Sequence, residues 1–170
     1  MTALRHLRAA IVLAAVCLAA PAALAQQPGW VAFGPGAEVR LPPYLWSKLR
    51  DDKSLAVASG GIAAIQFFLE FKTAPGASAR SGEDAVHELA KKLDLKVFES
   101  GDKQVLMEPR RTGLIGGREA RRMRMHIGFG SALVLMDLMV YESQKDAPEV
   151  LQFFDSDMEQ IILSIRRSGG

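Results

Sequence analysis

The chain is poor in cysteine, histidine and aromatic residues. Its 170 residues include one cysteine, three histidines, two tryptophans and two tyrosines. A single thiol excludes an intrachain disulfide, and so few histidine and cysteine side chains argue against a zinc centre, which needs three or four protein ligands. Apolar residues make up 49% of the chain, so its stability is expected to come from packing.

The longest apolar run lies close to the amino terminus and indicates a targeting segment. Arg5 and Arg8 precede an unbroken apolar run over residues 9–20, and residues 23–25 read Ala-Leu-Ala. A cationic start, an apolar centre and a small-x-small end are typical of a cleavable secretory signal peptide. We therefore predict that residues 1–25 are a signal peptide and that the protein resides in the periplasm.

Other roles of this leader fit it less well. Residues 9–24 are shorter than the ~20 apolar residues that cross a bilayer, and Pro21 interrupts them. Cys17 follows Val16 rather than the small residue that precedes the cysteine of a lipid-attachment site. The two arginines of the leader are not adjacent, whereas the twin-arginine export route requires an adjacent pair. The sequence therefore predicts a cut after Ala25 and no membrane anchor in the mature form.

The mature part, residues 26–170, has the length of one domain. Two of the 21 basic residues lie in the leader, and all 19 acidic residues lie after it, so this domain is close to neutral. Overall charge thus gives no reason to expect nucleic-acid binding. We predict one domain over the whole of this part.

Apolar periodicity predicts strands in the first half of this domain. Residues 29–39 are expected to form two short strands around the turn at residues 34–36. Residues 44–53 are ambiguous and allow a helical turn, and residues 54–59 fit a short edge strand. Residues 62–72 alternate most clearly, with Phe67 and Leu69 on the apolar face.

The second half alternates as well. A hairpin is expected around residues 100–102, followed by a loop over residues 109–117. Residues 119–129 alternate between apolar and basic side chains. Residues 132–141 are apolar on both faces except at Asp137, as in a central strand that is covered on both sides.

Two stretches have helical spacing. Ser81 is a candidate N-cap, with Asp84 completing a capping box. The tail, residues 148–166, keeps a 3.6-residue rhythm that residues 155–157 could divide into two helices. The predicted fold is α+β, a mostly antiparallel β-sheet flanked by helices.

The order of these elements resembles a known family. The features that carry the likeness are GWVAF at residues 29–33, EVRLP at 38–42, a Gly-Gly-Arg loop at 116–118 and ILSIR at 162–166. Together they resemble the PsbP-like α/β/α sandwich, shared by a lumenal photosystem II subunit, a nuclear Ran-binding protein and bacterial exported proteins such as DcrB. The resemblance implies a non-enzymatic binding or assembly module. It transfers no catalytic residue, and nothing in it indicates a photosynthetic role.

Arginines form the strongest candidate site. Guanidinium groups bind carboxylates and phosphates through paired hydrogen bonds, so a strand and a loop that carry several of them could hold an anionic partner. A solvated strand face is the alternative. Trp46 is a second candidate contact, because tryptophan is favoured at interface hot spots. The arginines are Arg110, Arg111, Arg118, Arg121, Arg122 and Arg124, of which the last four, with Trp46, are the predicted partner-binding residues.

Other motifs indicate no chemistry. The glycine-rich residues 113–117 lack the Lys-Ser/Thr that follows in phosphate-binding loops. His87 and His126 are too few for a metal site, so no metal, cofactor or catalytic residue is predicted. Asp137 is expected to form a structural ion pair with a nearby arginine.

Three functions remain open at this point. The favoured one is an exported, non-enzymatic accessory protein that binds a protein or another component of the cell envelope. The alternative is a periplasmic carrier of a small apolar ligand in a methionine-rich interior. An enzyme is disfavoured because no nucleophile, acid–base pair or metal set is recognisable.

Overall fold

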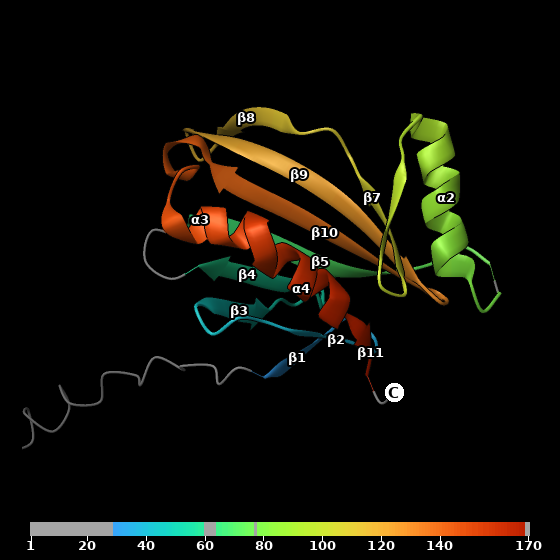
Figure 1. Cartoon of the computed structure of the whole chain (residues 1–170). Coiled ribbons are helices and arrows are strands. Elements are labelled where there is room, and N and C mark those ends of the chain that lie inside the picture. Colours follow the sequence, from blue (N-terminus) through green and yellow to red (C-terminus); the bar gives the residue numbers. More distant parts are fainter. Residues whose placement is uncertain (1–28, 60–63, 77, 169–170) are drawn as a thin grey trace, which may run out of the picture.

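The computed structural model describes residues 29–59, 64–76 and 78–168. The predicted leader and the cut after Ala25 lie outside these residues. Eight strands form one antiparallel sheet in the order β3-β4-β5-β10-β9-β7-β6, with β8 paired to β9, and β1, β2 and β11 form a second sheet (Figure 1). The strands are β1 Trp30–Phe33, β2 Ala37–Arg40, β3 Leu45–Leu49, β4 Leu55–Ser59, β5 Ile65–Thr73, β6 Val97–Ser100, β7 Lys103–Met107, β8 Arg111–Ile115, β9 Arg118–Phe129, β10 Ala132–Tyr141 and β11 Arg166–Arg167.

Helices lie on both faces of the large sheet (Figure 1). Helix α2 (Ser81–Leu93) packs on one face at the end where β9 and β10 meet. On the other face a single run comprises α3 (Pro148–Gln152), the π-helix η2 (Phe153–Asp157) and α4 (Met158–Ser164). A short 3₁₀ turn, η1 (Glu142–Gln144), joins β10 to this run. The predicted α+β sandwich is therefore confirmed. None of the described helices has the length and apolar content to cross a bilayer.

The central strand β10 shows how the two faces differ. Its burial alternates strictly, because successive side chains of a strand point to opposite faces. Val134, Met136, Leu138 and Val140 face the C-terminal helices and are almost completely buried. We call this side the inner face. The opposite side, the outer face, carries half-buried residues along β10, because α2 covers only one end of it.

The inner face holds the main core. Phe153 of η2 is fully buried, and its ring lies 5.8 Å from that of Phe67 on β5. The ring of Phe154 stands edge-on to Phe153, with the centroids 5.6 Å apart. These contacts anchor the C-terminal helical run to the sheet, and burial of such rings is a large stabilising contribution.

On the outer face, two glycines let α2 approach the sheet closely. A β-carbon at Gly82 would overlap the carbonyl oxygen of Ala132, and one at Gly128 would overlap that of Gly82. The amide of Gly82 donates a hydrogen bond to the carbonyl of Gly130 over 3.0 Å, and the amide of Gly130 donates to Glu83 over 3.0 Å. Backbone contact of this kind requires residues without a side chain.

The structure settles one ambiguous segment and corrects two local predictions. Residues 45–49 are strand β3 rather than a helical turn, and β3 makes β4 an internal strand. The predicted loop at 109–117 contains β8, because residues 111–115 find a partner in β9. Pairing with a distant strand leaves no local sequence signal.

The helix ends also differ from the predictions. Arg80, not Ser81, is the N-cap of α2, and no side chain caps this helix. Residues 155–157 do not divide the tail into two helices. They belong to the π-helical turn, which keeps the run continuous. Arg166 and Arg167 lie beyond the last helix in β11, paired with β2.

Candidate functional site

Strand β9 divides the predicted arginine cluster between the two faces of the sheet. Arg118, Arg122 and Arg124 occupy even positions of β9 and lie on the outer face, whereas Arg121 lies on the inner face. Alternation along a strand makes this unavoidable. The arginines of β9 therefore do not form a single site.

Arg122 is bound to Asp137 across the sheet. These residues sit on neighbouring strands, and both carboxylate oxygens accept hydrogen bonds from the guanidinium, one of them from Nε at 2.6 Å. Burial raises the pKa of Asp137, but the hydrogen bonds and positive charges of Arg122 and Arg124 outweigh it, so the pKa is lowered overall. The predicted structural ion pair of Asp137 is confirmed.

Arg124 is held less firmly. Its Nη2 lies 3.4 Å from Oδ2 of Asp137, the oxygen that also accepts from Nη2 of Arg122, and its buried Nε has no hydrogen-bond partner. Two guanidinium groups thus share one carboxylate, which leaves a net positive charge. Arg118 lies with its guanidinium carbon 4.1 Å from the centre of the Tyr141 ring and forms no ion pair with a described residue.

Trp46 lies on the same outer face as these arginines, but it is not close to them. Its side chain is 49% exposed on the edge strand β3. The strand pairing places Trp46 and Arg122 in one row across the sheet, separated by Ala58, Gln66 and Met139. Four strand spacings put about 19 Å between the two backbones.

Half-buried apolar side chains lie beside Gln66 on this face of the sheet, near the arginines. Phe68 on β5 and Leu135 and Met139 on β10 belong to this area, and Arg50 lies over the ring of Phe68 at 5.3 Å. We call this area the open sheet face. It consists of Trp46, Phe68, Arg118, Arg122, Arg124, Leu135, Asp137 and Met139.

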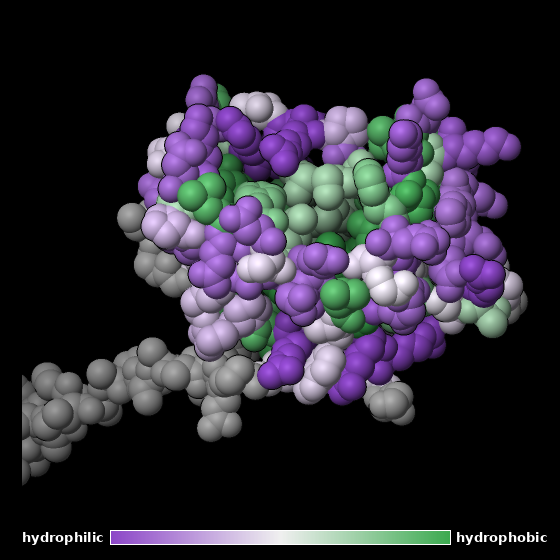
Figure 2. Space-filling view, viewed as in Figure 1, coloured by the Kyte–Doolittle hydropathy of each residue, from purple (hydrophilic) through white to green (hydrophobic). Residues whose placement is uncertain are grey.

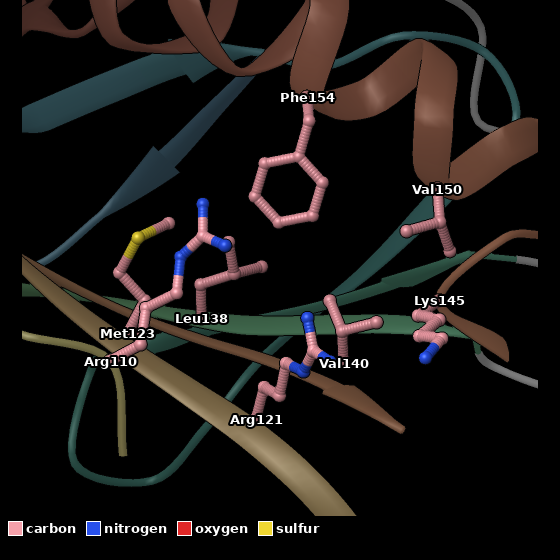
Figure 3. A pocket seen from close by; sticks show the side chains of 8 residues that line it. All are labelled: Arg110, Arg121, Met123, Leu138, Val140, Lys145, Val150 and Phe154. Carbon is pink, nitrogen blue, oxygen red and sulfur yellow. The ribbon is translucent and has the colours of Figure 1, made fainter. Parts of the chain in front are cut away.

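A pocket lies on the inner face, between the sheet and the C-terminal helices. Its volume is about 250 Å³. Figure 3 shows the side chains of Val150 and Phe154 reaching from the helical run toward those of the sheet. On this side of the molecule, Figure 2 shows an apolar area framed by hydrophilic side chains. The residues that line this sheet–helix pocket are Arg110, Arg121, Met123, Leu138, Val140, Lys145, Val150 and Phe154.

The pocket combines an apolar interior with a cationic rim. Arg121 contacts both carboxylate oxygens of Glu142, at 2.5 and 2.7 Å, and Lys145 reaches the same carboxylate at 3.0 Å. Hydrogen bonds from Lys145 and Arg121 lower the pKa of Glu142. The guanidinium of Arg110 lies 6.0 Å from the centre of the Phe154 ring and pairs with no carboxylate among the described residues.

The π-helical turn η2 forms part of one wall of this pocket, through Phe154. Within this turn, Phe153 points into the core while Phe154 faces the pocket. Next to it, the hydroxyl of Tyr44 donates a hydrogen bond to Asp157 over 2.5 Å and ties η2 to the start of β3. Burial, followed by the hydrogen bond and charge of Asp157, raises the pKa of Tyr44.

Sequence reasoning missed the pocket residues Lys145, Val150 and Phe154. Val150 and Phe154 fit the helical rhythm of the tail, and nothing in that pattern signals that they border a pocket. Among the methionines, only Met123 lines the pocket. Trp30 on β1 is 44% exposed, and the guanidinium of Arg166 lies over its ring.

The histidines lie apart. His87 is exposed on α2, and Nε2 of His126 lies 2.8 Å from Glu108 on the outer face. Within residues 29–59, 64–76 and 78–168, no three histidine, cysteine or acidic side chains gather closely enough to hold a metal ion.

No family model matches the chain, and no curated protein matches it. Several solved structures are similar to it, among them the following two. One is a protein of Bacteroides thetaiotaomicron VPI-5482, with a TM-score of 0.60 and 15% identity over 83% of this chain and 49% of that one. This chain thus spans about half the length of that protein. The other is PsbP (CyanoP) of Synechocystis sp. PCC 6803, with a TM-score of 0.35 and 12% identity over 83% and 94% of the two chains.

At 15% identity, the similarity to the Bacteroides protein concerns the fold alone. The match to PsbP, at a TM-score of 0.35, carries no argument. Many functions share one fold, so function has to be argued from the open sheet face and the sheet–helix pocket.

Proposed function

We propose that this protein is an exported, non-catalytic accessory protein that binds another protein of the cell envelope through the open sheet face. The observation that carries the proposal is the contrast between the two faces of β10. The inner residues are buried, whereas Leu135 and Met139 on the outer face are only half-buried beside Arg122 and Arg124. Apolar side chains next to arginine and tryptophan are the usual composition of an interface.

Charge indicates what kind of partner fits. Arg122 and Arg124 share one carboxylate, and Arg118 has none, so this edge of the open sheet face is positive. The favoured partner is a protein surface with an apolar centre and acidic residues along one side. Complementary charge would orient the two proteins, while burial of the apolar centre and Trp46 would supply most of the affinity.

Photo-crosslinking in intact cells tests this directly. A photoreactive amino acid replaces Trp46 in one variant and Leu151 in another, because these residues are almost equally exposed, at 49% and 50%, and Leu151 lies on α3. We expect a discrete adduct from position 46 only, and mass spectrometry should map it to an acidic, partly apolar segment of the partner.

A second variant makes the outcome decisive. Arg118→Gln removes a charge that has no carboxylate partner in the described residues, so the fold should be unaffected. We expect it to reduce the yield of the position-46 adduct at least threefold. Equal labelling from positions 46 and 151, or an adduct that is insensitive to Arg118→Gln, would refute the proposed interface.

Export is a separate part of the proposal. It is supported by Arg5 and Arg8, the apolar run that follows them and the small residues before Gln26. Fractionation should find the protein in the periplasm, with Gln26 at its amino terminus. Ala25→Pro should leave the uncut form attached to membranes. A cytoplasmic protein that begins at Met1 would contradict export.

The sheet–helix pocket favours a second candidate function, a ligand carrier. Its floor consists of apolar residues from β9 and β10, and it opens to the surface beside charged residues. The interior is not methionine-rich, because only Met123 contributes. A carrier would bind a small ligand with the purified protein alone, whereas the accessory function requires a partner protein.

A further inference from the structure

We infer that the sheet–helix pocket binds an amphipathic anion, a single alkyl chain that ends in a carboxylate. The inference rests on the carrier function above and specifies its ligand. Two features of the pocket lead to it, the apolar character of its interior and the uncompensated positive charge at its rim.

The interior fits a narrow apolar group. Met123, Leu138 and Val140 form the floor, and each is at most 4% exposed. Val150 and Phe154 close it from the helical side (Figure 3). A volume of about 250 Å³ lies just below the roughly 300–1,000 Å³ of pockets for drug-sized ligands, so it suits one chain rather than a fused ring system.

The rim supplies the charge. Arg110, Arg121 and Lys145 line the pocket, and none of its lining residues within the described chain is acidic. Glu142 neutralises only part of this charge, because Arg121 and Lys145 share it. Arg110 has no carboxylate partner, and its guanidinium stands over Phe154 with hydrogen-bond donors available. Arginine binds a carboxylate through two parallel hydrogen bonds, so Arg110 is the expected contact for the headgroup.

The site is held in place before any ligand arrives. Phe154 rests edge-on against the fully buried Phe153, and Tyr44 fixes the end of the same π-helical turn through Asp157. A wall with this support loses little freedom on binding, which favours affinity. The pocket and the open sheet face lie on opposite sides of the sheet, so both could be occupied at once.

The test is calorimetric titration of the purified protein, in the form that cells produce, with decanoate, decanol and acetate. We expect decanoate to bind, decanol to bind at least tenfold more weakly and acetate not to bind. Arg110→Gln should weaken decanoate at least tenfold and leave decanol unchanged. Arg80→Gln, an exposed arginine on the α2 side that pairs with Glu83, is the matched control and should change neither.

The outcomes separate this inference from the functions on which it depends. Equal affinity for decanoate and decanol would overturn the anion assignment and leave an apolar carrier. If neither decanoate nor decanol binds, the anion assignment and the carrier function are both wrong. Crosslinking from position 46 would not be affected by that result. Decyl phosphate in a fourth titration distinguishes the headgroups, and if it binds tenfold more tightly than decanoate, the carboxylate assignment is wrong. Thermal melting of each variant confirms that it is folded.

Discussion

Arg121 and Arg122 are adjacent in the chain, yet their side chains leave β9 on opposite faces of the sheet. Arg121 pairs with Glu142 at the rim of the sheet–helix pocket, and Arg122 pairs with Asp137 on the open sheet face. One peptide bond therefore separates the two candidate sites. This division allows each site to be altered while the other is left intact.

The ion pair of Asp137 should make stability depend on pH. Its folded-state pKa is below the ordinary value of 3.8, so its stabilising contribution is present above that value and is lost as the pH falls through the folded-state pKa. We expect Asp137→Asn to lower the free energy of unfolding by about 1–2 kcal/mol at neutral pH, between the effects of exposed and buried pairs.

Urea unfolding at a series of pH values measures this effect. The difference between the wild-type protein and Asp137→Asn should shrink as the pH falls below about 4. Asp146→Asn is the control, because Asp146 is exposed and has no ion pair among the described residues. A constant difference down to low pH would show that Asp137 does not act through its charge.

The contact between α2 and the sheet should tolerate no side chain at Gly82. Gly82→Ala places a methyl group against the carbonyl of Ala132, and we expect it to lower the free energy of unfolding by about 2–3 kcal/mol. Gly113→Ala is the matched control, since a methyl group there meets nothing within 4 Å. Equal stability of the two variants in chemical denaturation would mean that α2 does not lie where we describe it.

The hydrogen bond from Tyr44 to Asp157 should be visible at high pH. The pKa of Tyr44 is raised above the ordinary value of 10.0, so its stabilisation is complete below that pH and is lost as the pH rises through the folded-state pKa. Tyr44→Phe should cost about 1–2 kcal/mol at neutral pH, typical of a hydrogen bond to a charged group, and should remove this alkaline loss.

Ultraviolet absorbance of the phenolate checks this prediction. The chain has two tyrosines, and we expect Tyr44 to ionise in the folded protein only well above pH 10.0. Tyr141→Phe should leave the delayed titration in place, whereas Tyr44→Phe should abolish it. If the delay instead persists in Tyr44→Phe, Tyr44 is not the tyrosine whose pKa burial and the hydrogen bond to Asp157 raise.

Phe153 should be the residue of the π-helical turn on which stability depends most. It is fully buried against Phe67, so Phe153→Ala should cost about 3–5 kcal/mol. Phe98→Ala removes the same ring from a position that is 56% exposed on β6, and should change stability by less than about 0.5 kcal/mol. Thermal unfolding of both variants compares them, and similar losses would place Phe153 outside the core.

Periodicity predicted the long strands correctly, for a physical reason. Met123, Met125 and Ile127 alternate with basic residues because β9 is buried on one side and half-exposed on the other. This alternation involves only residues that are close together in the sequence, so it can be recognised from the sequence alone. The same rule places Arg121 and Arg122 on opposite faces of one strand, so the prediction that grouped them in one site was wrong.

Features that depend on distant partners could not be predicted. Residues 111–115 carry no alternation and become strand β8 only because β9 offers a free edge. Phe153 and Phe154 are identical in type, and only the way the helical run packs on the sheet distinguishes the core residue from the pocket residue. The pocket itself combines residues of β9, β10 and the helical run, which no local pattern connects.

The central claim is that the arginines of β9 serve two separate sites. The most direct test compares Arg121→Gln and Arg122→Gln, each measured for decanoate affinity and for the yield of the adduct from position 46. We predict that Arg121→Gln weakens decanoate binding alone and that Arg122→Gln lowers the adduct yield alone. If either variant impairs both measurements in a folded protein, the arginines act as one site and the account is wrong.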